Sequence, residues 1–161
     1  MRHTISILVS NEFGVLSRIS GLFSGRGFNI ESLSVAETLD AKISRMTIVT
    51  RGDDKVIEQI NKQLNKLINV IKVTDFTDEE HIERELALIK VTSNPESRAE
   101  ILSIVDIFRA KVVDVSPRSY TVEITGDEEK INAMTELLRP FGIKEIVKTG
   151  RIAMARSPKQ K

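Results

Sequence analysis

The most constraining feature of this 161-residue sequence is an order of hydrophobic periodicities that occurs twice. In the first half, residues 3–10 alternate between apolar and polar side chains, as in a strand with one buried face. Apolar residues then recur at helical spacing from Val15 to Phe23 and stop at the glycines of SGRGFN. The patterns continue as strand, strand, helix and strand over residues 29–38, 44–51, 52–70 and 70–76. The first half therefore predicts the element order βαββαβ.

The second half repeats this order after the acidic segment TDEEHIERE, residues 77–85, which is typical of a linker. Its strand and helix patterns cover residues 85–94, 95–109, 111–117, 119–125, 126–138 and 143–150. Elements in this order fold as an antiparallel sheet with two helices on one face. We therefore expect an α+β protein built from two ferredoxin-like βαββαβ sandwiches in tandem, over residues 1–77 and 78–161.

The composition excludes several classes of function. A formal net charge of +1 provides no overall field that would favour nucleic acid or an anionic membrane. Cysteine is absent, which excludes disulfides, thiol catalysis and thiolate metal sites. His3 and His81 have no second ligand or base at a useful spacing, so we expect both on the surface and predict no catalytic residue and no metal site. Because no apolar run of spanning length and no signal peptide is present, we expect a cytoplasmic protein.

Each predicted sheet leaves one face without helices. In the first half, this face carries small, mildly polar side chains: Thr4, Ser6, Ser32, Ser34 and Thr47. Such a face is either exposed to solvent or a docking surface, because small side chains let another element approach closely. The basic segment from Arg151 to the C-terminus is typical of a solvated terminus.

The segment SNEFGVLSRISGLFSGRGFNIESLSV, residues 10–35, places Asn11 and Asn29 at the two ends of one predicted helix. This helix begins near Gly14, and its unpaired N–H groups and dipole favour an anion such as a carboxylate. Gly14 lets a ligand approach the backbone, and the Asn11 carboxamide offers both a donor and an acceptor. The apolar residues that could line a pocket for a short branched side chain are Val15, Leu16 and Ile30.

The same residues also have purely structural explanations, because asparagine caps helices and glycine shapes turns. The corresponding stretch of the second half, SNPESRAEIL, has Ser97 at the position of Gly14. A helix in this architecture can therefore start without glycine, which favours the interpretation of the first entrance as a binding site.

The stretch ISILVSNEFGVLSRISGLFSGRGFNIESLSV and the following SRMTIVTRGDDKVIEQINKQLNKLINVIKVTD together resemble a known domain, the ACT domain of the regulatory small subunit of acetolactate synthase (acetohydroxyacid synthase). Residues 80–158 resemble the C-terminal domain of the same family. The resemblance implies a subunit with no catalysis and no cofactor of its own. The partner that it implies is a catalytic subunit carrying thiamine diphosphate, Mg²⁺ and FAD, which the small subunit activates and makes sensitive to inhibition by valine.

The resemblance also implies a homodimer, because ACT domains of this family pair side by side with the amino acid at their interface. The implied valine site combines the strand–helix loop of one chain with the second strand of its mate. Carried onto this sequence, it comprises Asn11, Gly14, Val15 and Leu16 from one chain with Asn29 and Ile30 from the other.

Two other classes of function remain to be weighed. A free-standing ACT-domain sensor that regulates another enzyme would use the same residues. RNA-binding domains that share the βαββαβ order need aromatic side chains on their central strands. Aromatic residues make up only 4% of this chain, and the stretch RMTIVT contains none, so the sequence argues against RNA binding.

Overall fold

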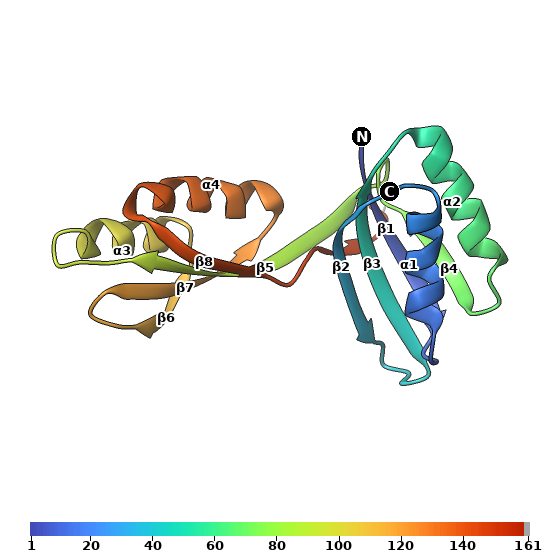
Figure 1. Cartoon of the computed structure of the whole chain (residues 1–161), viewed down its shortest axis with the longest axis horizontal. Helices are drawn as coiled ribbons and strands as arrows, with labels where there is room; N and C mark the ends of the chain where they lie inside the picture. Colours follow the sequence, from blue (N-terminus) through green and yellow to red (C-terminus); the bar gives the residue numbers. More distant parts are fainter. Residues whose placement is uncertain (160–161) are drawn as a thin grey trace. The chain divides into compact units, whose positions relative to one another are not determined.

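The computed structural model describes residues 1–159, which form two compact units (Figure 1). One unit comprises Met1–Ile82 together with the chain from Arg151 onward, and the other comprises Glu83–Gly150. The first unit contains β1 (Arg2–Ser10), α1 (Val15–Gly25), β2 (Ile30–Glu37), β3 (Ile43–Arg51), α2 (Asp54–Lys66) and β4 (Val70–Asp75). Its strands form one antiparallel sheet in the order β2-β3-β1-β4. This unit confirms the predicted βαββαβ order.

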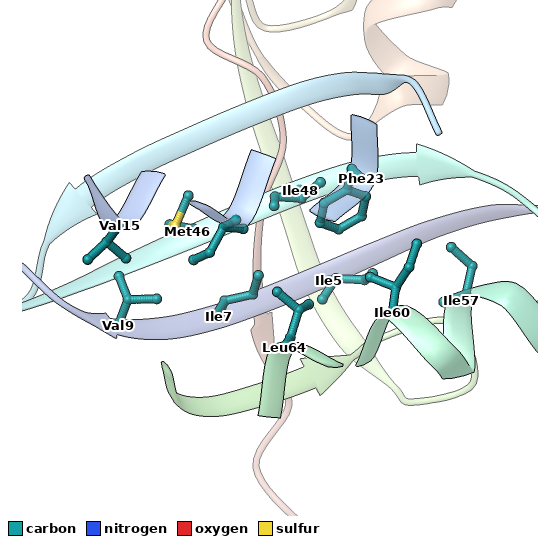
Figure 2. Packing of buried hydrophobic residues seen from close by; sticks show 11 residues of the cluster. Ile5, Ile7, Val9, Val15, Phe23, Met46, Ile48, Ile57, Ile60 and Leu64 are labelled. Atoms are coloured by element: carbon teal, nitrogen blue, oxygen red, sulfur yellow. The ribbon is translucent and has the colours of Figure 1, made fainter. Parts of the chain in front are cut away.

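The core of the first unit lies between this sheet and the two helices. Alternation along β1 directs one set of apolar side chains at the helices, and the helical repeats of α1 and α2 supply the opposing set. Figure 2 shows Ile5, Ile7, Val9, Met46 and Ile48 of the sheet packed against Val15, Phe23, Ile57, Ile60 and Leu64 of the helices. On α2, Ile57 is buried and Val56 is only partly buried.

The second unit repeats the architecture, which confirms the predicted fold class. Its elements are β5 (His81–Thr92, which starts in the first unit), α3 (Arg98–Ile107), β6 (Lys111–Val115), β7 (Ser119–Gly126), α4 (Glu128–Leu138), a 3₁₀ turn (Arg139–Phe141) and β8 (Ile143–Lys148). The strand order is β6-β7-β5-β8, and the core joins Ile89 and Val122 of the sheet to Ile101 and Met134 of the helices. Within residues 1–159, no helix is long and apolar enough to cross a membrane.

The C-terminal segment differs from the solvated terminus that the sequence predicts. Residues Ile152–Ala155 form a short strand, β9, which pairs with β5, and the segment from Arg151 onward belongs to the first unit rather than the second. The Arg151 N–H donates to Ser32 Oγ at 3.0 Å, and its Nη1 donates to Thr4 Oγ1 at 3.0 Å. Gln160 and Lys161, the end of the predicted basic tail, lie outside the described residues.

This segment covers part of the sheet face that lies opposite α1 and α2, which we call the rear face. The rear-face side chains of β1 and β3 that are buried in the structure are Thr4, Ser6, Thr47 and Val49. Small hydroxyl side chains let the returning chain approach closely, and Arg151 supplies hydrogen bonds that a buried hydroxyl needs. Of the two interpretations of this face, docking applies here, and the docked element is the chain's own C-terminal segment.

Candidate functional site

The entrance of α1 has an open set of backbone donors. Gly14 precedes the helix with φ 81° in the left-handed region, and no side chain caps the helix. The first intrahelical bond runs from the Arg18 N–H to the Gly14 carbonyl at 3.0 Å, so the N–H groups of residues 15–17 point out of the helix start without intrahelical acceptors. Together with the helix dipole, these groups make a local environment that favours a carboxylate.

The entrance of α3 provides a comparison within the same chain. There the Asn94 side chain accepts hydrogen bonds from the N–H groups of Glu96 at 3.0 Å and Ser97 at 2.9 Å. Asn11 occupies the corresponding place before α1, but its Nδ2 donates to the Ala41 carbonyl at 2.9 Å and to Glu37 Oε1 at 3.2 Å. The same residue type therefore orders the turn before one helix and joins the β2–β3 connection before the other, and neither helix has a side-chain cap.

This comparison corrects one step of the sequence argument about Gly14. Ser97 has φ −95° in the right-handed region, whereas Gly14 is left-handed, so the two entrances have different backbones and the fold itself requires a residue tolerant of positive φ at Gly14. The absence of a Cβ also leaves the space open, because an ideal Cβ on Gly14 would meet no heavy atom within 4 Å.

The predicted apolar lining residues have different environments. Val15 is buried in the core beneath the entrance, Leu16 is 46% exposed beside it, and Ile30 is half-buried against the core from β2. Val15 also borders a cavity of about 350 Å³ between the start of α1 and the end of α2, which includes neither Leu16 nor Ile30. Of the three, only Leu16 presents a largely free apolar surface.

Asn11 and Asn29 do not meet within one chain. Ile30 pairs with Thr50, and Thr50 pairs with His3 near the start of β1, whereas Asn11 follows Ser10 at the end of β1. At about 3.3 Å per residue of strand, the two ends of β1 put Asn11 and Asn29 about 25 Å apart. Asn29 itself is exposed, and its carbonyl accepts from Thr50 Oγ1 at 2.8 Å.

The sequence analysis missed an ion-pair group that holds the start of β2. Glu31 Oε2 accepts from Arg2 Nε at 2.8 Å, and Glu31 Oε1 lies 2.6 Å from Arg51 Nε. One carboxylate therefore joins β1, β2 and β3 beside Asn29. Only the strand register brings these three side chains together, so nothing in their sequence spacing could have revealed them.

His3 also differs from its prediction as a surface residue. Its side chain is buried, with Nδ1 2.8 Å from Thr77 Oγ1 and Nε2 3.2 Å from Asp54 Oδ1. His81 is half-buried, and its Nδ1 lies 2.7 Å from the Glu79 carbonyl oxygen. Both rings are thus held by local polar partners in the structure.

Comparison with known proteins places the two units in one family. Residues 5–72 match the family model described as an AHAS small subunit-like ACT domain, and residues 84–157 match the one described as the small subunit of acetolactate synthase. A protein of Aquifex aeolicus named acetolactate synthase small subunit is 61% identical over 156 residues, which cover 96% of this chain and 81% of that protein. The probable acetolactate synthase small subunit of Archaeoglobus fulgidus is 56% identical over 160 residues, covering 99% of this chain and 100% of that protein.

A solved structure gives the same result at the level of the fold. The crystal structure of the acetolactate synthase small subunit from Thermotoga maritima superposes with a TM-score of 0.88 at 44% sequence identity, covering 98% of this chain and 99% of that one. The resemblance drawn from the sequence is thereby confirmed. This chain belongs to the acetolactate synthase small-subunit family.

Proposed function

We propose that this chain is the regulatory subunit of an acetolactate synthase, which binds valine and transmits feedback inhibition to a catalytic subunit. The observation that carries the proposal is the uncapped entrance of α1, where Gly14 and three free N–H groups form a carboxylate-binding environment. The catalytic subunit supplies the chemistry with thiamine diphosphate, Mg²⁺ and FAD, and this chain raises its activity without taking part in the reaction. Both subunits work in the cytoplasm, where the sequence analysis placed this chain.

In the proposed complex, the valine carboxylate accepts hydrogen bonds from the N–H groups at the start of α1. The close approach uses the space above Gly14. Leu16 and Ile30 contact the branched side chain, while Val15 supports the entrance from the core. One methylene changes binding by only about 1–3 kcal/mol in an apolar pocket, so alanine binds weakly and leucine or isoleucine substitutes in part.

The complete site takes residues from two chains of a homodimer. β2 is an edge strand of its sheet, so its outer backbone groups are available to a second copy. Asn11 is hydrogen-bonded to Glu37 at the end of β2, whereas Asn29 precedes its start. Antiparallel pairing of β2 with its copy brings the start of one strand beside the end of the other. That geometry joins Asn11 of one chain to Asn29 and Ile30 of its mate and resolves their separation of about 25 Å within one chain.

Valine then shifts the dimer between a state that activates the catalytic subunit and a state that does not. A ligand shifts such an equilibrium only through a difference in its affinity for the two states. A coupling of about 1–3 kcal/mol, or about 5- to 150-fold in affinity, is typical of such linkage.

Mixed dimers test the site and its two-chain composition together. The variants Asn11→Ala and Asn29→Ala, each as a homodimer, have no intact site and lose valine binding in calorimetry and valine inhibition of the reconstituted enzyme. A dimer with one chain of each variant contains one doubly altered site and one intact site, so it binds half an equivalent of valine per chain. A mixed dimer that binds no valine would refute a site shared between chains.

The second candidate is a free-standing amino-acid sensor that acts on another enzyme through the same entrance. Reconstitution with the acetolactate synthase catalytic subunit separates the two. A sensor for another enzyme would bind valine without forming a complex with that subunit and without changing its rate.

A further inference from the structure

The first unit contains a cavity of about 540 Å³ on its rear face. Its lining comes from three neighbouring strands, the turn after β4 and the C-terminal strand β9, all within this unit. Ser6 and Leu8 of β1 lie at its base, and Met154 and Ala155 of β9 form part of its wall. The rear face is opposite the one that carries α1, so this cavity is separate from the proposed valine site.

Two cations flank the base of the cavity. Leu8 pairs with Arg45 of β3 on one side and with Lys72 of β4 on the other, so the three side chains stand in one row across the sheet. Adjacent strands are about 4.8 Å apart, which puts the Cα atoms of Arg45 and Lys72 about 10 Å apart. A carboxylate or phosphoryl group placed over Leu8 lies within reach of both long side chains.

Neither cation is neutralised within the described residues. Arg45 Nη1 donates to the neutral Ser6 Oγ at 2.9 Å, and no carboxylate of residues 1–159 lies within ion-pair distance of Arg45 or Lys72. Asp75 lines the cavity, but its Oδ2 accepts from Asn61 Nδ2 of α2 at 3.4 Å and lies 3.6 Å from His3 Nδ1, so the carboxylate faces the helix side of the sheet.

The other lining residues indicate which groups the ligand has besides its anionic group. The hydroxyl groups of Ser6 and Thr74 stand in the next row of the sheet and add neutral polar partners. Leu8, Met154 and Phe76 provide apolar contact surface around them. Glu79 is the second acidic residue that lines the cavity. Its N–H donates to the Phe76 carbonyl in the turn that follows β4, so Glu79 lies beyond the end of this strand and not beside Lys72.

We propose that this rear-face cavity is a second ligand site, which binds a small organic anion through Arg45 and Lys72 and holds its apolar body against Leu8 and Met154. Because Met154 belongs to β9, a bound ligand also stabilises the C-terminal strand on the sheet. The proposal is independent of valine binding at α1.

Calorimetry on the full chain tests the anionic contact, with hexanoate and hexyl phosphate as probes and hexan-1-ol as the neutral match. We expect both anions to bind at least tenfold more tightly than the alcohol, and the tighter of the two identifies the group that the site prefers. Arg45→Gln and Lys72→Gln should each weaken anion binding about tenfold, the effect of losing one charge-assisted contact. Lys55→Gln, on the exposed surface of α2, makes the same change of charge and should leave binding unchanged.

Hydrogen exchange provides the second readout. Hexanoate should slow exchange at residues 152–155 in the unaltered chain and in Lys55→Gln, but not in Arg45→Gln. The proposal is overturned if neither anion binds, if the alcohol binds equally well, or if all three variants weaken binding alike. Thermal unfolding of each variant shows whether a loss of binding reflects a loss of fold.

Discussion

Replacing Gly14 by aspartate places a negative charge at the start of α1, where we propose that the carboxylate of valine binds. The left-handed backbone at Gly14 costs most L-residues about 1–2 kcal/mol, but asparagine and aspartate adopt it more readily than others. A new Cβ there meets no heavy atom within 4 Å. Gly14→Asn is therefore a matched control, with the same size and backbone preference but no charge.

The expected loss of affinity follows from Coulomb's law. Two like charges about 5 Å apart repel by about 0.8 kcal/mol in water and by about 3 kcal/mol at an effective dielectric constant of 20. Gly14→Asp should therefore bind valine between about 4-fold and a few hundredfold more weakly than Gly14→Asn. Folding should respond in the opposite direction, because a carboxylate at a helix N-terminus stabilises the helix by about 0.3–1 kcal/mol.

Calorimetry with valine and chemical denaturation measure the two effects separately. Gly14→Asp should be at least as stable as Gly14→Asn and yet bind valine more weakly, with the difference shrinking as salt is added. Equal valine affinity in the two variants would refute the placement of the carboxylate at this helix start. A weaker affinity in Gly14→Asn than in the unaltered chain would measure the separate contribution of added volume.

Three further predictions concern stability and ionisation. Leu64→Ala in the first core should lower the free energy of unfolding by about 2–5 kcal/mol in urea denaturation, whereas Ile68→Ala, at a side chain 99% exposed, should change it by less than about 0.5 kcal/mol. Arg151→Ala removes the donor to a buried hydroxyl of β1 and should lower the free energy of unfolding by about 1–3 kcal/mol, with faster hydrogen exchange in β9. The Arg139 guanidinium, through its hydrogen bond and its charge, holds the pKa of Glu136 below its usual value; Arg139→Ala should raise that pKa in an NMR titration. Because folding lowers this pKa, the pair stabilises the fold above the unfolded pKa of Glu136, and this stabilisation is lost as pH falls through the folded pKa.

The contrast between Asn11 and Asn94 shows where local sequence stops being informative. Both follow a serine at or just after the end of a unit's first strand, yet the Asn94 side chain accepts hydrogen bonds in the turn before its helix and Asn11 turns to the β2–β3 connection. The partner of each side chain is set by residues that are distant in sequence. The sequence therefore identified the entrance as a candidate site, while the tertiary structure showed that its N–H groups are uncapped.

The sequence by itself determined the two βαββαβ units, the buried faces of most elements and the family, because periodicity and motif are carried by residues close together in the chain. Only the tertiary structure decided the burial of His3, the anchoring of β2 by Glu31 and the return of residues 151–155 to the first unit. Each of these depends on strand register or on contacts across much of the chain. A four-residue strand with basic residues on either side has no periodicity long enough to reveal its partner, so its place on the rear face follows from the folded sheet that receives it.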